Sequence, residues 1–184
     1  NFARLPQTRP VMGSLSTAVD EAVDLYQEAH REIQFVVDQD PTLPEFRFDP
    51  DQMKRVLINL LDNAVSAVES VEEPRITIRT QYDSLLKLVR LSINDNGSGI
   101  PATDRDRVFE PYFSTKESGT GLGLAIVRRI VEDHNGFVRA LANEPKGTRM
   151  LVELPVSDVE AAPIVRAPVL GVIGDIGDAD PKKG

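Results

Sequence analysis

Residues 51–70 are the most strongly patterned segment of this sequence, and they constrain the fold more than any other segment. Their apolar residues recur at three- and four-residue steps, which is the spacing of a helix with one buried face. That face holds Met53, Val56, Leu57, Leu60, Leu61, Ala64, Val65 and Val68. The opposite side holds Gln52, Arg55, Asn59, Asp62, Asn63 and Ser66. Such a helix must cover another layer of the protein with its apolar face, while its polar side remains available.

The remaining segments mix helices and strands in no regular order. The spacing of Leu15, Ala18, Ala22, Leu25 and Ala29 predicts a helix over 14–32 with Ser14 as its N-cap, and a further helix is predicted over 122–134. Strand patterns cover 33–37, 46–48, 75–82, 86–94, 137–142 and 148–154. Because regular βαβ alternation is missing, the sequence predicts an α+β fold. We expect a mixed, mostly antiparallel sheet with helices packed on one face, and no Rossmann fold.

The length of 184 residues is suited to one domain with additional segments at its ends. We expect 1–13 to be a linker, 14–155 to be the domain, and 156–184 to be a linker or tail that includes the apolar run 169–173. Hydrophobic residues make up 41% and charged residues 27%, values that exclude a disordered chain. No apolar run approaches the roughly 20 residues that cross a bilayer, so we expect no membrane contact by this segment.

Charge and residue usage exclude several classes of site. A net charge of −8 argues against nucleic-acid binding, which needs a basic face. The absence of cysteine excludes disulfides, zinc–thiolate sites and thiol nucleophiles. His30 and His134 are the two histidines, so a metal ion would have to use oxygen ligands, and this favours Mg²⁺.

The polar side of the 51–70 helix is the first candidate for chemistry. Asn59 and Asn63 are one helical turn apart, with Asp62 and Ser66 beside them. An amide oxygen is a neutral, hard ligand that suits a Mg²⁺ ion carrying phosphate. The alternative is an ordinary solvated helix face.

Two glycine-rich segments are the next candidates. Asp95 ends an apolar strand and is followed by Gly97 and Gly99, so its carboxylate can accept a hydrogen bond from an exocyclic amine such as that of adenine. A plain loop turn is the alternative. The run 119–124 leads directly into a helix, whose exposed N–H groups favour an anion such as a triphosphate. Here the alternative is a packing role for the glycines.

Between these segments lies an aromatic stretch that contains Phe109, Tyr112 and Phe113 and ends near Lys116. Aromatic residues in a glycine-bounded loop indicate a lid that packs when it closes, and Lys116 would be available to a phosphate. Buried aromatic residues that anchor the loop are the alternative, and the two roles are compatible.

Five motifs in order resemble the N, first glycine, F, second glycine and third glycine boxes of sensor histidine kinases. They are Asn59-Leu-Leu-Asp-Asn63-Ala64, Asp95-Asn-Gly-Ser-Gly99, Phe109-Glu-Pro-Tyr-Phe113, Gly119-Thr-Gly-Leu-Gly123 and Gly147-Thr148. The resemblance covers about residues 14–155, and within this family the sequence is most similar to nitrogen-regulation kinases of the NtrY or NtrB type. It implies the Bergerat fold, a two-layer sandwich shared with gyrase B, MutL and Hsp90, and it implies ATP and Mg²⁺ as ligands.

The resemblance also implies roles for individual residues. Asn59, Asp62 and Lys116 would be catalytic, with Asp62 the neighbouring candidate for assisting proton transfer, and Asn63 would hold Mg²⁺. The nucleotide site would consist of Asn59, Asn63, Asp95, Gly97, Gly99, Ile100, Phe109, Phe113, Lys116, Gly119, Thr120, Gly121, Leu122, Gly123, Leu124 and Thr148. Ser66 stands where many family members have a lysine, so Lys116 or Arg55 would meet the phosphate charge.

The related ATPases carry a glutamate where this chain has Asn59, and an amide cannot act as that base. The resemblance therefore implies transfer of the γ-phosphate to a histidine on dimerisation helices outside this chain, for relay to a response regulator. We interpret His30 as a surface helix residue and His134 as a residue at a helix end, near the C-terminal end of the helix dipole. The alternatives are a hydrolytic ATPase and a non-catalytic interaction module. We expect the domain to be monomeric when isolated and to lie in the cytoplasm of a bacterial cell. A membrane anchor elsewhere in the parent protein is compatible with this expectation.

Overall fold

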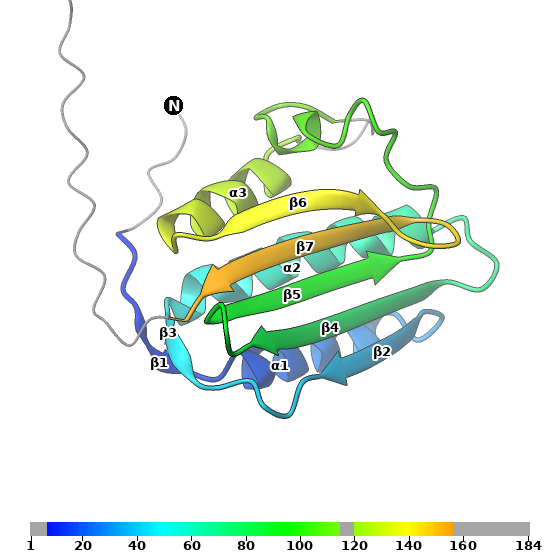
Figure 1. Cartoon of the computed structure of the whole chain (residues 1–184). Coiled ribbons are helices and arrows are strands. Elements are labelled where there is room, and N and C mark those ends of the chain that lie inside the picture. The colour runs from blue at the N-terminus through cyan, green and yellow to red at the C-terminus, as the bar shows by residue number, and fades with distance from the viewer. Residues whose placement is uncertain (1–6, 115–119, 157–184) are drawn as a thin grey trace, which may run out of the picture.

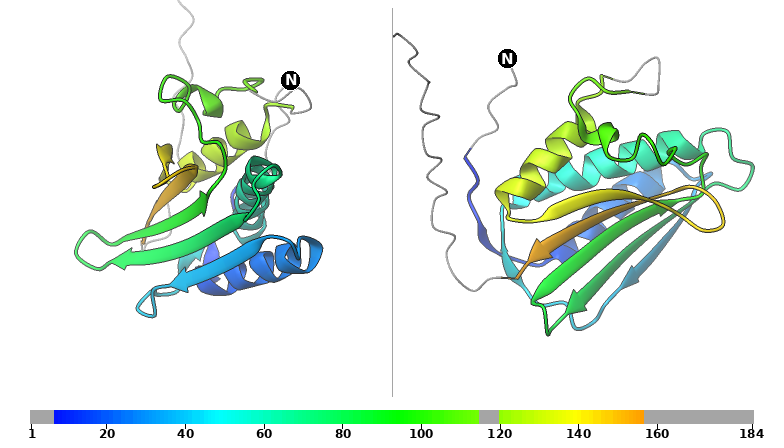
Figure 2. Two further views of the ribbon diagram at one scale, coloured as in Figure 1. Left: turned by 90° about the vertical axis from the view of Figure 1, so that its right-hand side faces the viewer. Right: turned by 45° about the horizontal axis from the view of Figure 1, so that its top comes forward.

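The computed structural model describes residues 7–114 and 120–156, which form two layers (Figure 1). A five-stranded sheet with the order β2-β4-β5-β7-β6 is covered on one face by three α-helices, and β1 and β3 form a second, two-stranded sheet (Figure 2). The elements are β1 (Val11–Gly13), α1 (Leu15–Ala29), β2 (Gln34–Gln39), β3 (Phe46–Phe48), α2 (Pro50–Val68), β4 (Arg75–Asp83), β5 (Leu88–Asp95), the 3₁₀ turn η1 (Arg107–Phe109), α3 (Gly123–Asp133), β6 (Phe137–Ala142) and β7 (Thr148–Pro155). The predicted α+β sandwich is confirmed.

The sheet is mixed and mostly antiparallel, as predicted. β2 pairs with β4 in parallel, whereas the β4–β5, β5–β7 and β6–β7 pairs are antiparallel. The face away from the helices carries cross-strand ion pairs. Arg90 and Arg139 both contact Glu153, at 3.1 and 2.9 Å, and Arg79 contacts Asp38 at 2.7 Å. This face is therefore polar, and the hydrophobic core lies between the sheet and the helices.

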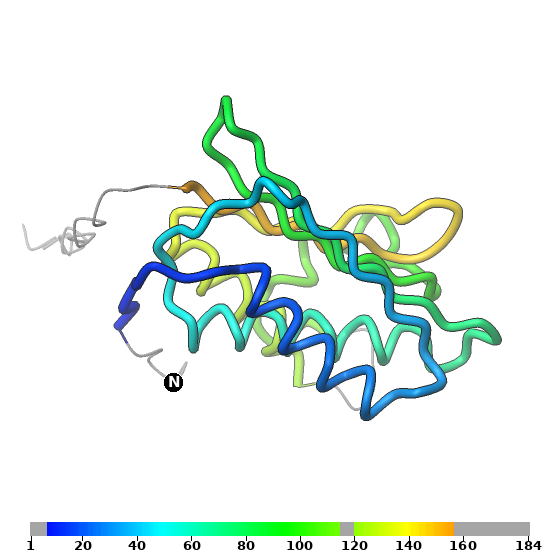
Figure 3. The backbone as a smooth tube through the Cα atoms, turned by 90° about the horizontal axis from the view of Figure 1, so that it is seen from below, coloured from blue at the N-terminus to red at the C-terminus, as the bar shows by residue number. Residues whose placement is uncertain are grey.

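The predicted apolar face of α2 is buried, although Val65 is only partly so. In α1, which lies beside α2 in the helical layer (Figure 3), the predicted face is partly wrong, because Leu25 is 57% exposed. The buried residues of α1 are Leu15, Val19, Ala22, Val23 and Tyr26. Both sets of residues have helical spacing, so only the packing of α1 against α2 decides between them. Among the helices of the described ranges, none is long and apolar enough to cross a bilayer.

The N-terminal segment is attached to the domain from residue 8 onwards. Residues 11–13, which we expected to be linker, form β1 and pair with β3. The Thr8 hydroxyl donates to Gln52 Oε1 at 3.1 Å, which explains why Gln52 is buried on the predicted polar side of α2. Ser14 caps α1 as predicted, accepting from the N–H of Thr17. The described fold therefore includes residues before Ser14, and the predicted tail lies outside the described residues except for Val156.

Asp49 joins three segments at the start of α2. Its side chain caps the helix by accepting from the N–H of Gln52 at 3.1 Å, and its other oxygen accepts from the N–H of Arg9 at 2.7 Å. Its own N–H donates to His134 Nε2 at 3.0 Å, at the end of α3. His134 is thus a structural residue at a helix end, as expected, and it also links α3 to α2.

Replacing Asp49 with alanine is expected to lower the free energy of unfolding by about 2 kcal/mol, because the change removes a helix cap and leaves the partly buried N–H of Arg9 without this acceptor. Urea denaturation measures this loss. Ser14→Ala is the matched control, since Ser14 only caps the exposed start of α1, and it should cost about 1 kcal/mol or less. Equal losses in the two variants would show that the contact with Arg9 contributes nothing.

Candidate functional site

An open cleft of about 610 Å³ lies beside α2 and contains most of the predicted site. Its walls come from α2, the end of β5, the segment 98–114, the start of α3 and the start of β7. The predicted residues that line it are Asn59, Asp62, Asn63, Asp95, Gly99, Ile100, Phe113, Thr120, Gly121, Gly123, Leu124 and Thr148. The structure therefore brings together residues that are up to 89 positions apart in the sequence, from Asn59 to Thr148.

Asp95 lies at one end of the cleft, and its carboxylate is fixed in place. The side chain is 4% exposed, and its Oδ1 accepts from the N–H groups of Gly97 at 2.9 Å and Thr148 at 3.2 Å. The carbonyl of Asp95 accepts from Asn143 Nδ2 at 2.8 Å. A buried carboxylate held in one orientation is a specific acceptor for a donor such as an amine.

The glycines after Asp95 have different roles. Gly99 has φ = +81° and lines the cleft, so its backbone requires the freedom of glycine. Gly97 was predicted to bind the nucleotide, but it does not line the cleft. A Cβ at this position would be 2.3 Å from the carbonyl oxygen of Ala67, so Gly97 instead allows the loop to pack closely on α2.

The polar side of α2 faces the cleft, and Asn59 connects it to α3. The Asn59 amide nitrogen donates to the carbonyl of Arg55 at 2.8 Å, which directs its oxygen towards α3. A Cβ at Gly123 would be 2.8 Å from that oxygen, so any larger residue at the start of α3 would require the Asn59 side chain to shift. Arg55 itself is exposed and does not line the cleft, so Arg55 is not placed to meet phosphate charge.

The start of α3 has the properties of an anion site. The N-cap residue Leu122 makes no side-chain capping hydrogen bond. Leu122 was predicted to belong to the nucleotide site, but it does not line the cleft. Gly121, Gly123 and Leu124 do line the cleft. The unpaired N–H groups of a first helical turn attract negative charge, and a phosphate group is the usual partner.

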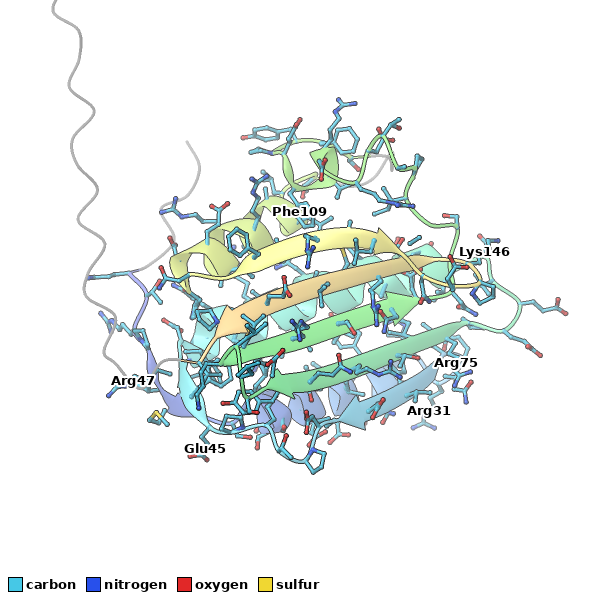
Figure 4. The ribbon with its side chains drawn as sticks, in the orientation of Figure 1. Arg31, Glu45, Arg47, Arg75, Phe109 and Lys146 are labelled. Carbon is cyan, nitrogen blue, oxygen red and sulfur yellow. The ribbon has the colours of Figure 1, made fainter. Side chains whose placement is uncertain are left out.

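The aromatic stretch 109–113 is held to the domain by a buried phenylalanine, and its three aromatic side chains differ in exposure. Phe109 was predicted to bind the nucleotide, but it is 5% exposed and packs in the core beside α3 (Figure 4), outside the lining of the cleft. Phe113 lines the cleft, and the Arg107 guanidinium lies 4.6 Å from its ring centre. The N–H of Tyr112 donates to the carbonyl of Gly121 at 2.9 Å, which joins the two ends of the loop. Lys116 and Gly119 lie outside the described residues.

The prediction missed several residues of the cleft, of which Lys146 is the most informative. Lys146 lies in the turn between β6 and β7 (Figure 4), next to Gly147 and Thr148, and so belongs to the Asp95 end of the cleft. Its position directly before the Gly-Thr motif could have identified it. The other missed residues include Ser98, Ser114, Met150 and the segment 69–71 that follows α2. Ser98 lies within the motif from Asp95 to Gly99, whereas the others carry no sequence signal of their own.

Asp62, on the other flank of α2, is bonded to α1. The Tyr26 hydroxyl donates to Asp62 Oδ1 and also lies 3.2 Å from the carbonyl of Ile58. Burial of the phenol, followed by the hydrogen bond to Asp62 and the charge of that carboxylate, raises the pKa of Tyr26 above its usual value of 10.0. The phenol therefore remains a donor at neutral pH.

Tyr26→Phe is expected to lower the free energy of unfolding by about 2 kcal/mol at pH 7, because a hydrogen bond to a charged group is lost. Since the folded-state pKa is raised, this contribution is complete below pH 10 and is lost as the pH rises further. Urea denaturation of both proteins between pH 7 and pH 11 measures the difference, which should shrink above pH 10. Tyr82→Phe is the control, because no described residue bonds to the Tyr82 hydroxyl. A constant difference up to pH 11 would contradict the prediction.

Comparison with known proteins identifies relatives with this architecture. The family described as histidine kinase-, DNA gyrase B-, and HSP90-like ATPase matches residues 48–158. Sensor histidine kinase ZraS of Escherichia coli (strain K12) is 39% identical over 145 residues, which cover 78% of this chain and 30% of ZraS. The sensory histidine kinase/phosphatase NtrB of Escherichia coli O157:H7 is 36% identical over 162 residues, which cover 83% of this chain and 46% of NtrB. The chain thus spans less than half of these two relatives.

Solved structures give the same result. The catalytic domain of histidine kinase ThkA superimposes with a TM-score of 0.73 at 32% identity, over 80% of this chain and 96% of that domain. ThkA has also been solved in complex with the response regulator TrrA, and that kinase matches with a TM-score of 0.71 at 27% identity, over 82% of this chain and 42% of ThkA. The chain therefore belongs to the family of histidine kinase-, DNA gyrase B- and HSP90-like ATPases, as an ATP-binding catalytic domain of the sensor histidine kinase type.

Proposed function

We propose that this domain binds ATP together with Mg²⁺ and presents the γ-phosphate to a histidine on the dimerisation helices of its parent kinase. The observation that carries the proposal is one cleft that has the fixed carboxylate of Asp95 at one end and the Asn59 amide beside the start of α3, with Asn63 in the lining of the same cleft. One end suits a purine amine and the other suits a phosphate chain.

The residues present fit the two ligands. Asp95 would accept from the adenine amino group, and the N–H groups at the start of α3 would receive phosphate oxygens. Asn63 would hold Mg²⁺ through its amide oxygen, and Lys116 is a further candidate for the phosphates. The metal ion would neutralise charge on the transferring phosphoryl group. Asn59 would orient the phosphate chain from the α3 flank of α2.

Transfer to an acceptor is favoured over hydrolysis by the chemistry of Asn59. An amide cannot remove a proton from water, so the position lacks the general base that a hydrolytic ATPase needs. Asp62 lies next to it but is bonded to Tyr26. We therefore propose that the domain exerts its activity by positioning and by charge stabilisation, with the nucleophile supplied from outside the chain.

Calorimetric titration with a non-hydrolysable ATP analogue, with and without Mg²⁺, tests the proposal. The chain should bind the analogue, and Mg²⁺ should strengthen binding. In the presence of Mg²⁺, Asn63→Ala should raise the dissociation constant of the analogue about 10-fold. In the absence of Mg²⁺ the constant should change little, because only the metal contact is lost. Gln81→Ala, an exposed amide on β4 away from the cleft, is the matched control. Absence of heat from the unmodified chain would instead favour a non-catalytic interaction module.

The partners follow from the same proposal. The direct partner would be the acceptor helices of the parent kinase, and the response regulator would receive the phosphoryl group afterwards. ThkA offers a precedent, because that kinase was crystallised with a response regulator. We further propose that the domain works in the cytoplasm of a bacterial cell, where ATP is available, and that it is monomeric when it is separate from its dimerisation helices.

A further inference from the structure

We propose that Lys146 is a specificity-determining residue, whose ammonium group donates to the ring nitrogen N1 of the bound adenine while Asp95 accepts from the adjacent amine. The inference rests on the proposed function, because it takes the purine to lie at the Asp95 end of the cleft. It adds a residue outside the five motifs that would read the base and not the phosphates.

Lys146 is the one cation among the described residues that line the cleft. Three acidic residues, Asp62, Glu69 and Asp95, line the same cleft, so its described lining carries more negative than positive charge. Positive charge that served a polyphosphate would be expected beside the start of α3. Lys146 instead belongs to the Asp95 end, and no described residue forms an ion pair with its ammonium group. This placement favours a contact with the base.

The turn that carries Lys146 is fixed against the end of β5 (Figure 4). The next residue, Gly147, has φ = +112°, and a Cβ there would lie 1.9 Å from the carbonyl oxygen of Asp95. The carbonyl of Gly147 accepts from the N–H of Asn143 at 3.0 Å. The N–H of Thr148 donates to Asp95 Oδ1 at 3.2 Å. The backbone beside Lys146 therefore stays close to Asp95, whereas its exposed side chain has the freedom to extend over the purine end.

Adenine offers a donor and an acceptor next to each other. Its amine donates, and N1, which is bonded to the carbon that carries the amine, accepts. A carboxylate and an ammonium group at neighbouring positions match this edge, with Asp95 on the amine and Lys146 on N1. In guanine an oxygen replaces the amine and N1 carries a hydrogen. In the same orientation, guanine would therefore face the carboxylate with an acceptor and the ammonium group with a donor, so the pair selects adenine.

Calorimetric titration of this chain with ADP, 1-deaza-ADP and 7-deaza-ADP tests the contact. Lys146→Met keeps a long, unbranched side chain but removes the donor, and it should raise the dissociation constant of ADP about fivefold. The unmodified chain should bind 1-deaza-ADP about fivefold more weakly than ADP. With 1-deaza-ADP, Lys146→Met should add no further loss, because the two changes remove the same contact.

Two matched controls accompany this experiment. 7-Deaza-ADP loses a different ring nitrogen, so Lys146→Met should still weaken its binding about fivefold. Lys54→Met makes the same change at an exposed lysine of α2 that does not line the cleft, and it should leave all dissociation constants unaltered. GDP extends the test to specificity, because Lys146→Met should lower the preference for ADP over GDP.

Each other outcome overturns the inference in a recognisable way. Unchanged binding of ADP by Lys146→Met would identify Lys146 as an ordinary solvated lysine of a turn. An equal loss with all three adenine nucleotides would show that Lys146 acts through the phosphate charge. A loss that disappears with 7-deaza-ADP and persists with 1-deaza-ADP would contradict the contact with N1. Failure of the unmodified chain to bind ADP would overturn the proposed function itself, which keeps the two failures distinguishable.

Discussion

Asp95→Asn is expected to weaken binding of the ATP analogue by about 100-fold while leaving the fold intact. Oδ1 of Asp95 accepts from two backbone N–H groups, so an asparagine must keep its carbonyl oxygen at that position. Its NH₂ group then replaces the second carboxylate oxygen, and a donor faces the adenine amine where an acceptor is required. Calorimetry measures the loss, and thermal unfolding checks that the variant is folded.

Asp38→Asn is the matched control for this experiment. Asp38 lies on the far face of the sheet, where it pairs with Arg79 at 2.7 Å and is 56% exposed, so the same chemical change should leave nucleotide affinity unaltered. Equal affinity in Asp95→Asn and in the unmodified chain would contradict the assignment of Asp95 as the purine acceptor. It would also remove the main support for the orientation of the nucleotide in the cleft.

Gly147→Ala is expected to cause the largest loss of stability, about 3 kcal/mol or more. Gly147 has φ = +112°, which an alanine rarely adopts, and a Cβ there would lie 1.9 Å from the carbonyl oxygen of Asp95. The obstacle is backbone, so the turn between β6 and β7 must move away from the end of β5. Because Thr148 and Asn143 hold Asp95 from this turn, ATP binding should weaken as well.

Urea denaturation measures the loss of stability in Gly147→Ala, and Gly13→Ala is the control. A Cβ at Gly13 would meet only the ring of Phe48, at 3.1 Å, and a side chain can shift where a backbone carbonyl cannot. We expect Gly13→Ala to change the free energy of unfolding by about 1 kcal/mol or less. Similar losses in the two variants would show that the close approach of Gly147 to Asp95 is not the cause.

Several features of the cleft could be predicted from the sequence because their signals are local. The spacing along α2 identified both its buried face and its polar stripe, and Asn59, Asp62, Asn63 and Ser66 all line the cleft. The five ordered motifs identified the family, since each carries its own glycine, amide or carboxylate requirement. The prediction that these motifs share one site came from the resemblance to the family. Their spacing in the sequence does not by itself predict that Asn59 and Thr148 line one cavity.

Other features could not be predicted, because they depend on contacts between distant segments. Phe109 and Phe113 stand in the same aromatic stretch, yet one is in the core and the other lines the cleft. Leu25 and Tyr26 are adjacent on α1, and α2 determines which of them is buried. Gln52 is polar by type but is buried, because Thr8 returns to it across 44 positions.

By itself, the sequence determined the three α-helices and every strand except β1, which glycines permit tight turns, and which polar side chains are suited to a nucleotide and its metal ion. These properties depend on the conformational preferences of residues within a few positions of each other. The tertiary structure alone decided that Asp62 is held by Tyr26, that Lys146 borders the Asp95 end, and that Asp49 joins the N-terminal segment to α2 and α3. Such contacts arise when the helical layer packs on the sheet, because packing selects one partner among many that local patterns allow.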